Sequence, residues 1–153
     1  MMKKLSKVVL AFLMLGFVSI NGLSAQDLTD EDFKDYAIIL LAQKSITDKI
    51  SPYVNELIEK QDGIDGNRYA ELDAAAGGDV AKLPADATDF EKQFYGIVQK
   101  QVNKKKKAAQ TVVSQLATHG IGAKKYNAVK KAYAGGGDAK AKVDGYLAEL
   151  SAE

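Results

Sequence analysis

The sequence predicts an all-α domain, in which a duplicated helical hairpin forms a four-helix bundle with an extra C-terminal helix. Apolar residues recur every three or four positions, and no alternating apolar run has the length of a strand. A helix–turn–helix corner also occurs twice, at residues 63–69 and 120–126, 57 residues apart (121 − 64). In each corner, a glycine can take the left-handed conformation that ends a helix. The following isoleucine and a tyrosine five residues later have the spacing of a hydrophobic staple.

The two other expected helix starts follow the same pattern. Thr29 suits an N-cap, and Asp32 lies at the acidic third position of a capping box. At the same offset of 57 residues, Asp86 is the expected cap, Asp89 the box residue and Phe90 the staple residue. Four matched starts in two pairs indicate an internal repeat.

Residues 1–25 have the layout of a secretory signal peptide. Three lysines precede an apolar run over residues 8–20, and small residues lead to an expected cleavage after Ala25, with cleavage after Ser24 as the second choice. We therefore expect export to the periplasm or the extracellular space, with a retained N-terminal anchor as the alternative. The sequence has no cysteine, which excludes disulfides and attachment of a lipid through an N-terminal cysteine.

Residues 26–153 are long enough for a single helical domain with one core. The leader holds three of the 21 basic residues and none of the 20 acidic ones, so the remaining chain has a net charge of −2 (18 − 20). This balance gives no general attraction to nucleic acid.

Proline and glycine positions define the predicted helix boundaries in the first half of the domain. A first helix is predicted over residues 30–61, with a kink near Ser51 because Pro52 disrupts helical hydrogen bonding. A second helix is expected over residues 66–76, ended by a glycine pair, and Asp79 can cap one further turn.

A third helix is predicted over residues 87–119, and its apolar stripe contains Phe90, Phe94, Val98, Val102, Ala109, Val112 and Leu116. Lys105 lies where that stripe would continue, so we expect the stem of at least one lysine in the run 104–107 to cross apolar surface. A fourth helix follows over residues 123–134. Asp138 is the expected cap of the last helix, whose apolar face contains Val143, Tyr146, Leu147 and Leu150.

Several of these motifs resemble those of the bacterial family catalogued as domain of unknown function 4168. The resemblance rests on Phe33-x-x-Tyr36-Ala37, on Gly120-Ile121 with Tyr126-Asn127, and on Asp138. The chain departs from the family pattern at Gly122-Ala123, which lacks a threonine-type cap, and at Asp138-Ala139, which lacks a proline. The resemblance implies an exported helical protein without an established activity, so it transfers no functional residues.

The residues that could carry catalysis or bind metal do not form a recognisable constellation. His119 is the single histidine, and its place at a helix C-terminus suits interaction with the helix dipole. Asp62, Asp65 and Asn67 lack the spacing of an EF-hand loop and suit turns and caps. Neither glycine run is followed by the lysine and hydroxyl residue of a phosphate loop. We therefore expect no enzyme, no metal site and no cofactor.

The predicted function is that of an exported interaction or structural module of the bacterial envelope. Its partner would be a protein or another envelope component, with no nucleic acid and at most weak peripheral contact with a membrane. Lys104, Lys105, Lys106 and Lys107 form a candidate surface for anionic groups, although such a run also suits a solvated helical turn. The alternative function is a carrier that holds a small apolar ligand between its helices.

Overall fold

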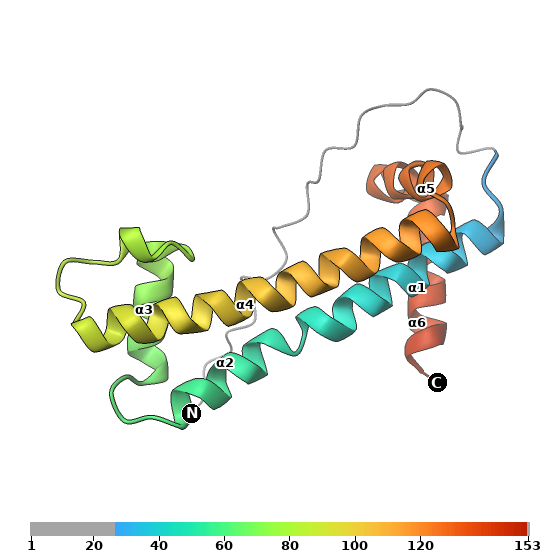
Figure 1. Ribbon diagram of the computed structural model, residues 1–153. Helices are drawn as coiled ribbons and strands as arrows, with labels where there is room; N and C mark the ends of the chain where they lie inside the picture. The colour runs from blue at the N-terminus through green and yellow to red at the C-terminus, as the bar shows by residue number, and fades with distance from the viewer. Residues whose placement is uncertain (1–26, 153) are drawn as a thin grey trace. The chain divides into compact units, whose positions relative to one another are not determined.

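The computed structural model describes residues 27–152, which are helical apart from short connections and contain no strand. The all-α class is therefore confirmed. Two compact units are present: unit 1 comprises the described residues up to Ser45 and those from Ala109 onward, and unit 2 comprises Ile46–Ala108. Figure 1 shows the elements, which are α1 (Asp30–Thr47), α2 (Ile50–Glu59), α3 (Gly66–Ala76), the 3-10 turn η3 (Val80–Lys82), α4 (Asp89–Gln115), the π-helical turn η4 (Leu116–Gly120), α5 (Ala123–Gly135) and α6 (Gly137–Ser151).

Unit 1 begins with the predicted capping box. The Thr29 backbone N–H donates to the Asp32 carboxylate at 2.9 Å, and the Asp32 backbone N–H donates to the Thr29 hydroxyl at 3.3 Å. This pair satisfies two backbone donors that a helix start leaves without a helical partner. The core of unit 1 consists of Phe33, Tyr36, Ala37, Ile39, Val113, Ala117, Ile121, Tyr126, Val129 and Val143.

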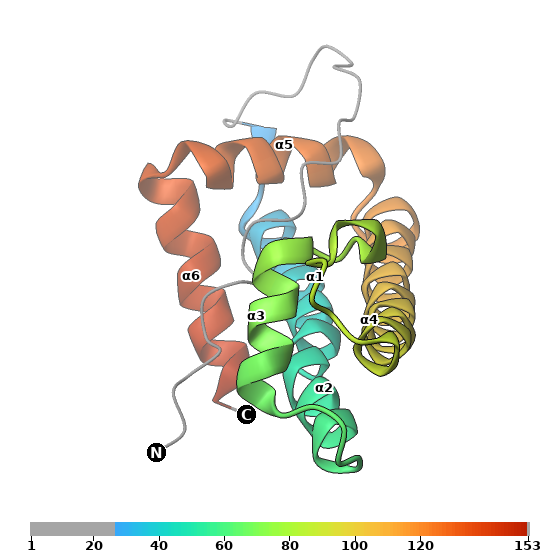
Figure 2. The ribbon, with the colours of Figure 1, turned by 90° about the vertical axis from the view of Figure 1, so that its left-hand side faces the viewer.

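The C-terminal helix α6 leaves α5 at the sharp corner visible in Figure 2. Gly136 and Gly137 have φ values of 81° and 63°, which side chains rarely tolerate. The helix starts at Gly137 with Gly136 as N-cap, so the expectation that Asp138 caps it is wrong. Asp138 instead lies in the first turn, where a carboxylate suits the helix dipole. Val143 is fully buried, and the predicted apolar face packs around it.

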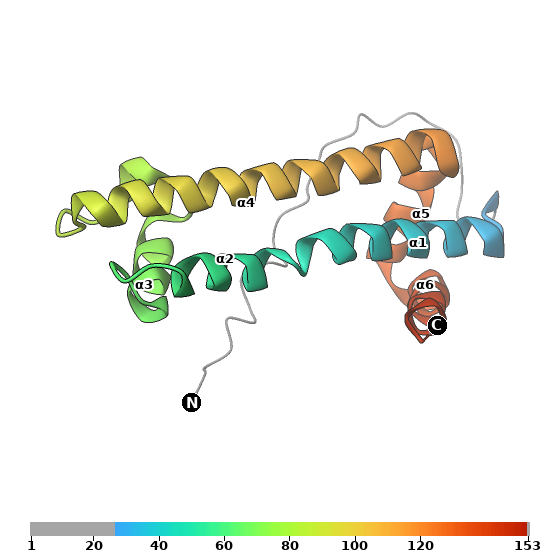
Figure 3. The same ribbon diagram turned by 60° about the horizontal axis from the view of Figure 1, so that its bottom comes forward.

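The predicted first helix is divided in two. A turn at residues 48–49 separates α1 from α2, as Figure 3 shows, whereas the sequence indicated one kinked helix to residue 61. Pro52 is the third residue of α2, where its missing N–H costs no helical hydrogen bond. The helix is therefore interrupted before the proline, two to three residues earlier than the expected kink near Ser51.

Unit 2 contains the second helix where it was predicted. Asp65 accepts a hydrogen bond from the Arg68 backbone as the N-cap of α3, and Gly77 ends the helix in the left-handed conformation. The Asp79 side chain caps η3, as expected, by accepting from the backbone N–H of Ala81. The core of this unit consists of Ile50, Ile58, Ile64, Tyr69, Leu72, Ala76, Ala87, Tyr95, Val98 and Val102.

Both corners bury their isoleucine and tyrosine. Ile64 and Tyr69 belong to the core of unit 2, and Ile121 and Tyr126 belong to the core of unit 1. The role assigned to the corner glycines is wrong, because neither Gly63 nor Gly120 has a positive φ angle. In the second corner, the left-handed residue is the N-cap Gly122, at φ 89°.

The start of α4 also differs from the prediction. Its capping box is formed by Thr88 and Glu91, since the Thr88 N–H donates to the carboxylate at 2.7 Å and the Glu91 N–H donates to the hydroxyl at 3.2 Å. Asp86 and Asp89 therefore do not have the expected roles. Relative to Thr29, the cap lies at an offset of 59 residues (88 − 29), not 57.

The predicted signal peptide, residues 1–25, lies outside the described residues. Among the helices of residues 27–152, none combines the length and hydropathy needed to cross a membrane. The structure has two compact units, and the single helical domain expected over residues 26–153 stays a prediction.

Candidate functional site

The predicted lysine run forms one turn of α4 in unit 2. Lys104, Lys106 and Lys107 are exposed, whereas Lys105 is half-buried with its ammonium 4.4 Å from the ring centroid of Tyr53. That ammonium lies over the negative face of an aromatic ring, a favourable cation–π geometry. Lys105 is therefore held against the unit, whereas the side chains of its lysine neighbours are exposed.

An exposed apolar surface precedes the lysines on the same helix. The side chains of Phe90 and Ile97 are 45% and 60% exposed, although both are large and apolar. Phe90 was expected on the apolar stripe that faces the core, and this expectation is wrong, because Glu91 and Tyr95 are the buried residues in the first turns of α4. Val98 and Val102 are buried as predicted. Buried side chains at this end of the helix are Glu91, Tyr95, Val98 and Val102.

We call the row beside this core row the outer stripe, in which Phe94 and Gln101 are half-buried and the other residues are exposed. It consists of Phe90, Phe94, Ile97, Gln101, Lys104 and Ala108. The alternating spacings of four and three residues keep these positions on one side of a helix. The apolar pattern of the sequence assigned Phe90 and Val98 to one helix face, although they belong to two different rows. The outer stripe can be recognised in the sequence only when it is separated from the neighbouring core row, which has the same spacing.

Phe90 is exposed but well supported. A Cβ atom added to Gly63 would lie 2.3 Å from the Phe90 ring, so only a glycine permits this approach. A second neighbour is Phe94, whose ring is stacked with that of Phe90 at a centroid distance of 6.0 Å and an interplanar angle of 10°. The first corner thus fixes an aromatic side chain at the surface.

Charged groups surround the start of α4. The Arg68 guanidinium donates to the buried Glu91 carboxylate at 2.7 Å, and also contacts Glu71 and Asp86. The bond from Arg68 and the backbone bond from Thr88 lower the pKa of Glu91 to about 2. Glu91 therefore stays ionised and links the cap of α4 to α3.

A second polar group lies deeper in unit 2. The Tyr95 hydroxyl donates to Asp73 at 2.8 Å and accepts from the Gly78 backbone at 2.9 Å. The Gln99 amide donates to the Tyr69 hydroxyl and to Asp73, both at 3.1 Å. Burial raises the pKa of Tyr69 and of Tyr95, so both hydroxyls stay protonated and serve the structure.

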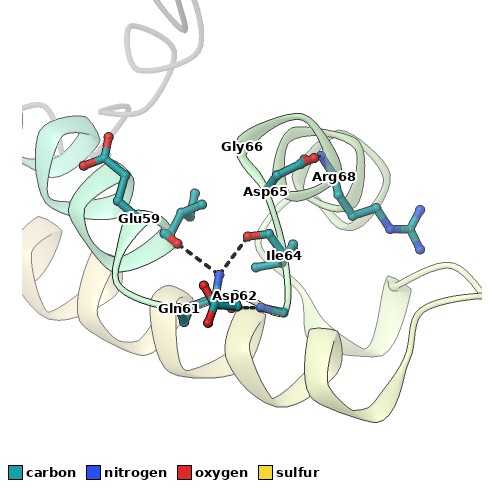
Figure 4. Close-up of a pocket in the computed structure, with 9 residues that line it drawn as sticks. Glu59, Gln61, Asp62, Ile64, Asp65, Gly66 and Arg68 are labelled. Atoms are coloured by element: carbon teal, nitrogen blue, oxygen red, sulfur yellow. Dashed lines mark hydrogen bonds between the residues drawn. The ribbon is translucent and has the colours of Figure 1, made fainter.

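An open hollow of about 590 Å³ lies at the first corner, lined by Ile58, Glu59, Gln61, Asp62, Gly63, Ile64, Asp65, Gly66 and Arg68. Figure 4 shows the Gln61 amide, which donates to the Ile64 carbonyl at 2.8 Å, and the Arg68 side chain directed away from the loop. The predicted turn residues Asp62 and Asp65 lie here, and Asp65 serves as an N-cap. The hollow is not an enclosed cavity of the kind that a carrier of an apolar ligand needs.

Unit 1 contains a related charge pair and the single histidine. The Lys125 ammonium donates to the Asp32 carboxylate at 2.8 Å. Burial alone would raise the pKa of Asp32, but the bonds from Lys125 and Thr29 outweigh it and lower this pKa. His119 is exposed in η4, at the C-terminal end of the long helix, as the sequence indicated.

Within residues 27–152, no group of three or more histidine, aspartate or glutamate side chains could hold a metal ion. The charged clusters described above are ion pairs and helix caps. Comparison of the chain with family models, curated proteins and solved structures gave no significant match. The outer stripe and the adjacent lysines are therefore the candidate site that the geometry itself provides.

Proposed function

We propose that this protein is an exported interaction or structural module of the bacterial envelope, and that it binds a protein partner through the outer stripe. The exposure of Ile97 is the observation that supports this proposal. An isoleucine that is 60% exposed beside two stacked phenylalanines leaves apolar surface in water. Covering this surface with a partner would be favourable.

The lysine run would form a polar edge of the contact between the outer stripe and its partner. Exposed lysines at the end of an apolar row resemble the rim of an interface, where charge selects the partner and its orientation. A membrane is the less favoured partner, because acidic residues border the other end of the stripe at Asp86 and Asp89. Four lysines alone would give weak and salt-sensitive contact with anionic lipid, each contributing about 1 kcal/mol.

The carrier function remains the alternative, without a specific observation in its favour. We assign no catalytic role and no cofactor to the protein. Membership of the family catalogued as domain of unknown function 4168 is part of the proposal, supported by the motifs of residues 33–37 and 120–127.

We also propose that the chain contains a duplicated helical hairpin, within a four-helix bundle that has α6 as an extra helix. Two capping boxes at an offset of 59 residues support this proposal. The carboxylate of each box forms an ion pair with a basic residue, and these two residues, Arg68 and Lys125, are 57 positions apart. Tyrosine pairs support it as well, since the rings of Tyr36 and Tyr126 lie 5.4 Å apart and those of Tyr95 and Tyr69 lie 5.6 Å apart.

Site-specific photo-crosslinking in cells tests the interaction. A photoreactive residue at Ile97 should give a discrete adduct in the envelope fraction, and the same residue at Ile38 serves as the matched control. Ile38 is similarly apolar and 42% exposed, but it lies on α1. Absence of an adduct at Ile97, or equal labelling at both positions, would refute the proposed role of the outer stripe. Adducts with lipid alone would favour the membrane alternative.

Export is tested by intact mass. Expression of the full chain should give a protein that begins at Gln26 and lies outside the cytoplasm. A species that keeps Met1 and stays in the inner membrane would replace export with an N-terminal anchor.

A further inference from the structure

We propose that the partner of the outer stripe is a second copy of this chain, bound with the two α4 helices antiparallel. This inference rests on the proposed function and names the partner. The stripe consists of residues 90–108, all within unit 2. Its apolar part lies between an acidic end, with Asp86 and Asp89, and a basic end with the lysine run. An antiparallel pair places each acidic end beside the basic end of the other copy.

The stripe has the spacing that pairs two helices. Positions 90, 94, 97, 101, 104 and 108 are separated alternately by four and three residues, which is the spacing of the contact positions in coiled coils. The stripe spans 19 residues, a rise of about 27 Å at 1.5 Å per residue. In the register described next, its positions 90–101 face those of the other copy. In the antiparallel register, Phe94 faces Ile97 of the other copy, and the same contact recurs across the twofold axis.

This register also matches the charges. Asp89 lies five residues before Phe94, and position 102 lies five residues after Ile97, so Asp89 faces position 102 of the other copy. This position is between Lys100 and Lys104. Asp89 and Lys100 are eleven residues apart, about three helical turns, so they lie on the same flank of the stripe. In a twofold antiparallel pair, each flank meets its own counterpart.

These charged groups are accessible. The Asp89 side chain is 97% exposed, with an ion-pair distance of 3.9 Å to Lys92, and both Lys100 and Lys104 are exposed. A parallel pair would instead place lysine runs side by side, which like-charge repulsion disfavours. The charge pattern therefore selects the antiparallel orientation.

The apolar centre is already ordered for contact. The Phe90 ring contacts Gly63 and is stacked with Phe94, and Phe94 packs against the core of unit 2. A rigid aromatic loses little conformational entropy when a partner covers it. This order distinguishes Phe90 from a side chain that is only solvated.

Sedimentation velocity of the purified full chain, from about 1 to 500 µM, tests self-association in the range of modest affinities. We expect a reversible monomer–dimer equilibrium. Ile97→Glu should raise the dimer dissociation constant at least ~tenfold, because it places a charge at the centre of the contact. The matched variant Ile38→Glu should leave it unchanged. A wild-type chain that stays monomeric, or a dimer that Ile97→Glu does not weaken, overturns the proposal.

Charge reversal tests the orientation. Asp89→Lys alone, and Lys100→Glu with Lys104→Glu, should each weaken the dimer severalfold, whereas the triple variant should recover it. Recovery requires position 89 to meet positions 100 and 104 of the other copy, so failure to recover overturns the antiparallel register. Circular dichroism and the thermal midpoint of each variant report whether it is folded.

The two proposals fail separately. A monomeric chain that still gives a discrete Ile97 adduct of another mass in cells would overturn self-pairing and leave the interaction module intact. Absence of that adduct would overturn the interaction module itself.

Discussion

Units 1 and 2 share a common set of contacts but differ in how they fill their interiors. In unit 1, the Asp32 carboxylate belongs to the capping box of α1 and pairs with Lys125. Lys125 is the third residue of α5 after its N-cap. In unit 2, Glu91 pairs with Arg68 at the corresponding position. Each pair ties a helix start to a short helix.

The interiors differ in polarity. Tyr36 in unit 1 has ring contacts with Tyr126 and with Tyr133, at centroid distances of 5.4 and 5.8 Å. Tyr95 in unit 2 has instead a network of hydrogen bonds through its hydroxyl, to Asp73 and from Gly78. Both units thus contain tyrosine ring contacts, and the tyrosine on the long helix adds hydrogen bonds through its hydroxyl in unit 2.

This difference shows which contacts the framework requires. The capping box, the charge pair and the tyrosine pair occur in both units, while the hydrogen bonds of the Tyr95 hydroxyl differ from the surroundings of Tyr36. We therefore expect changes to the shared contacts to affect the two units alike, and loss of the Tyr95 hydroxyl to cost more than loss of the Tyr36 hydroxyl.

Truncation of the corner tyrosines should have the largest effect. Tyr69→Ala and Tyr126→Ala each remove a buried aromatic ring, and each should lower the free energy of unfolding by about 3–5 kcal/mol. Urea unfolding followed by circular dichroism measures both. A loss below about 1 kcal/mol at one corner would contradict the equivalence of the corners.

The corner glycines should respond differently from each other. Gly63→Ala forces the Phe90 ring away and should destabilise the protein by about 1–3 kcal/mol. Gly120→Ala meets no atom within 4 Å and should change stability by less than about 1 kcal/mol. Thermal unfolding compares the two variants, and equal losses would show that the close approach of Phe90 has no energetic weight.

Removal of one hydroxyl should separate the interiors. Tyr95→Phe deprives Asp73 of a donor and the Gly78 N–H of an acceptor, at a cost of about 1–3 kcal/mol. Tyr36→Phe keeps its ring contacts and should cost less than about 1 kcal/mol. Urea titration of both variants decides this point, and a larger loss for Tyr36→Phe would reverse the comparison.

We expect the smallest effect when acid weakens the Arg68–Glu91 and Lys125–Asp32 ion pairs and so lowers the free energy of unfolding. The pKa of Glu91 is lowered from 4.5 to about 2, so its stabilisation is present above pH 4.5 and is lost as the pH falls through 2. The pKa of Asp32 is lowered from 3.8, which gives the same sign. Glu91→Gln and Asp32→Asn should each flatten the fall in stability with acid. Urea midpoints measured between pH 6 and pH 2 test this, and an unchanged slope in either variant would contradict the role of that carboxylate.

Local sequence determined the helices and several of their ends. Asp65, Gly77 and Asp79 act where the sequence placed them, because caps and left-handed turns depend on a few neighbouring residues. The Thr29–Asp32 box was predictable for the same reason. The Lys104–Lys107 run was also identified from sequence, as was the burial of both corner tyrosines.

Tertiary structure decided which side of α4 faces the core. Two parallel rows on this helix contain apolar residues with the same spacing, so periodicity did not distinguish buried Tyr95 from exposed Phe90. The choice follows from the Arg68–Glu91 pair, which draws Glu91 toward α3, and from Gly63, which leaves room for the Phe90 ring at the surface. These contacts join residues more than twenty positions apart, and no local pattern contains them.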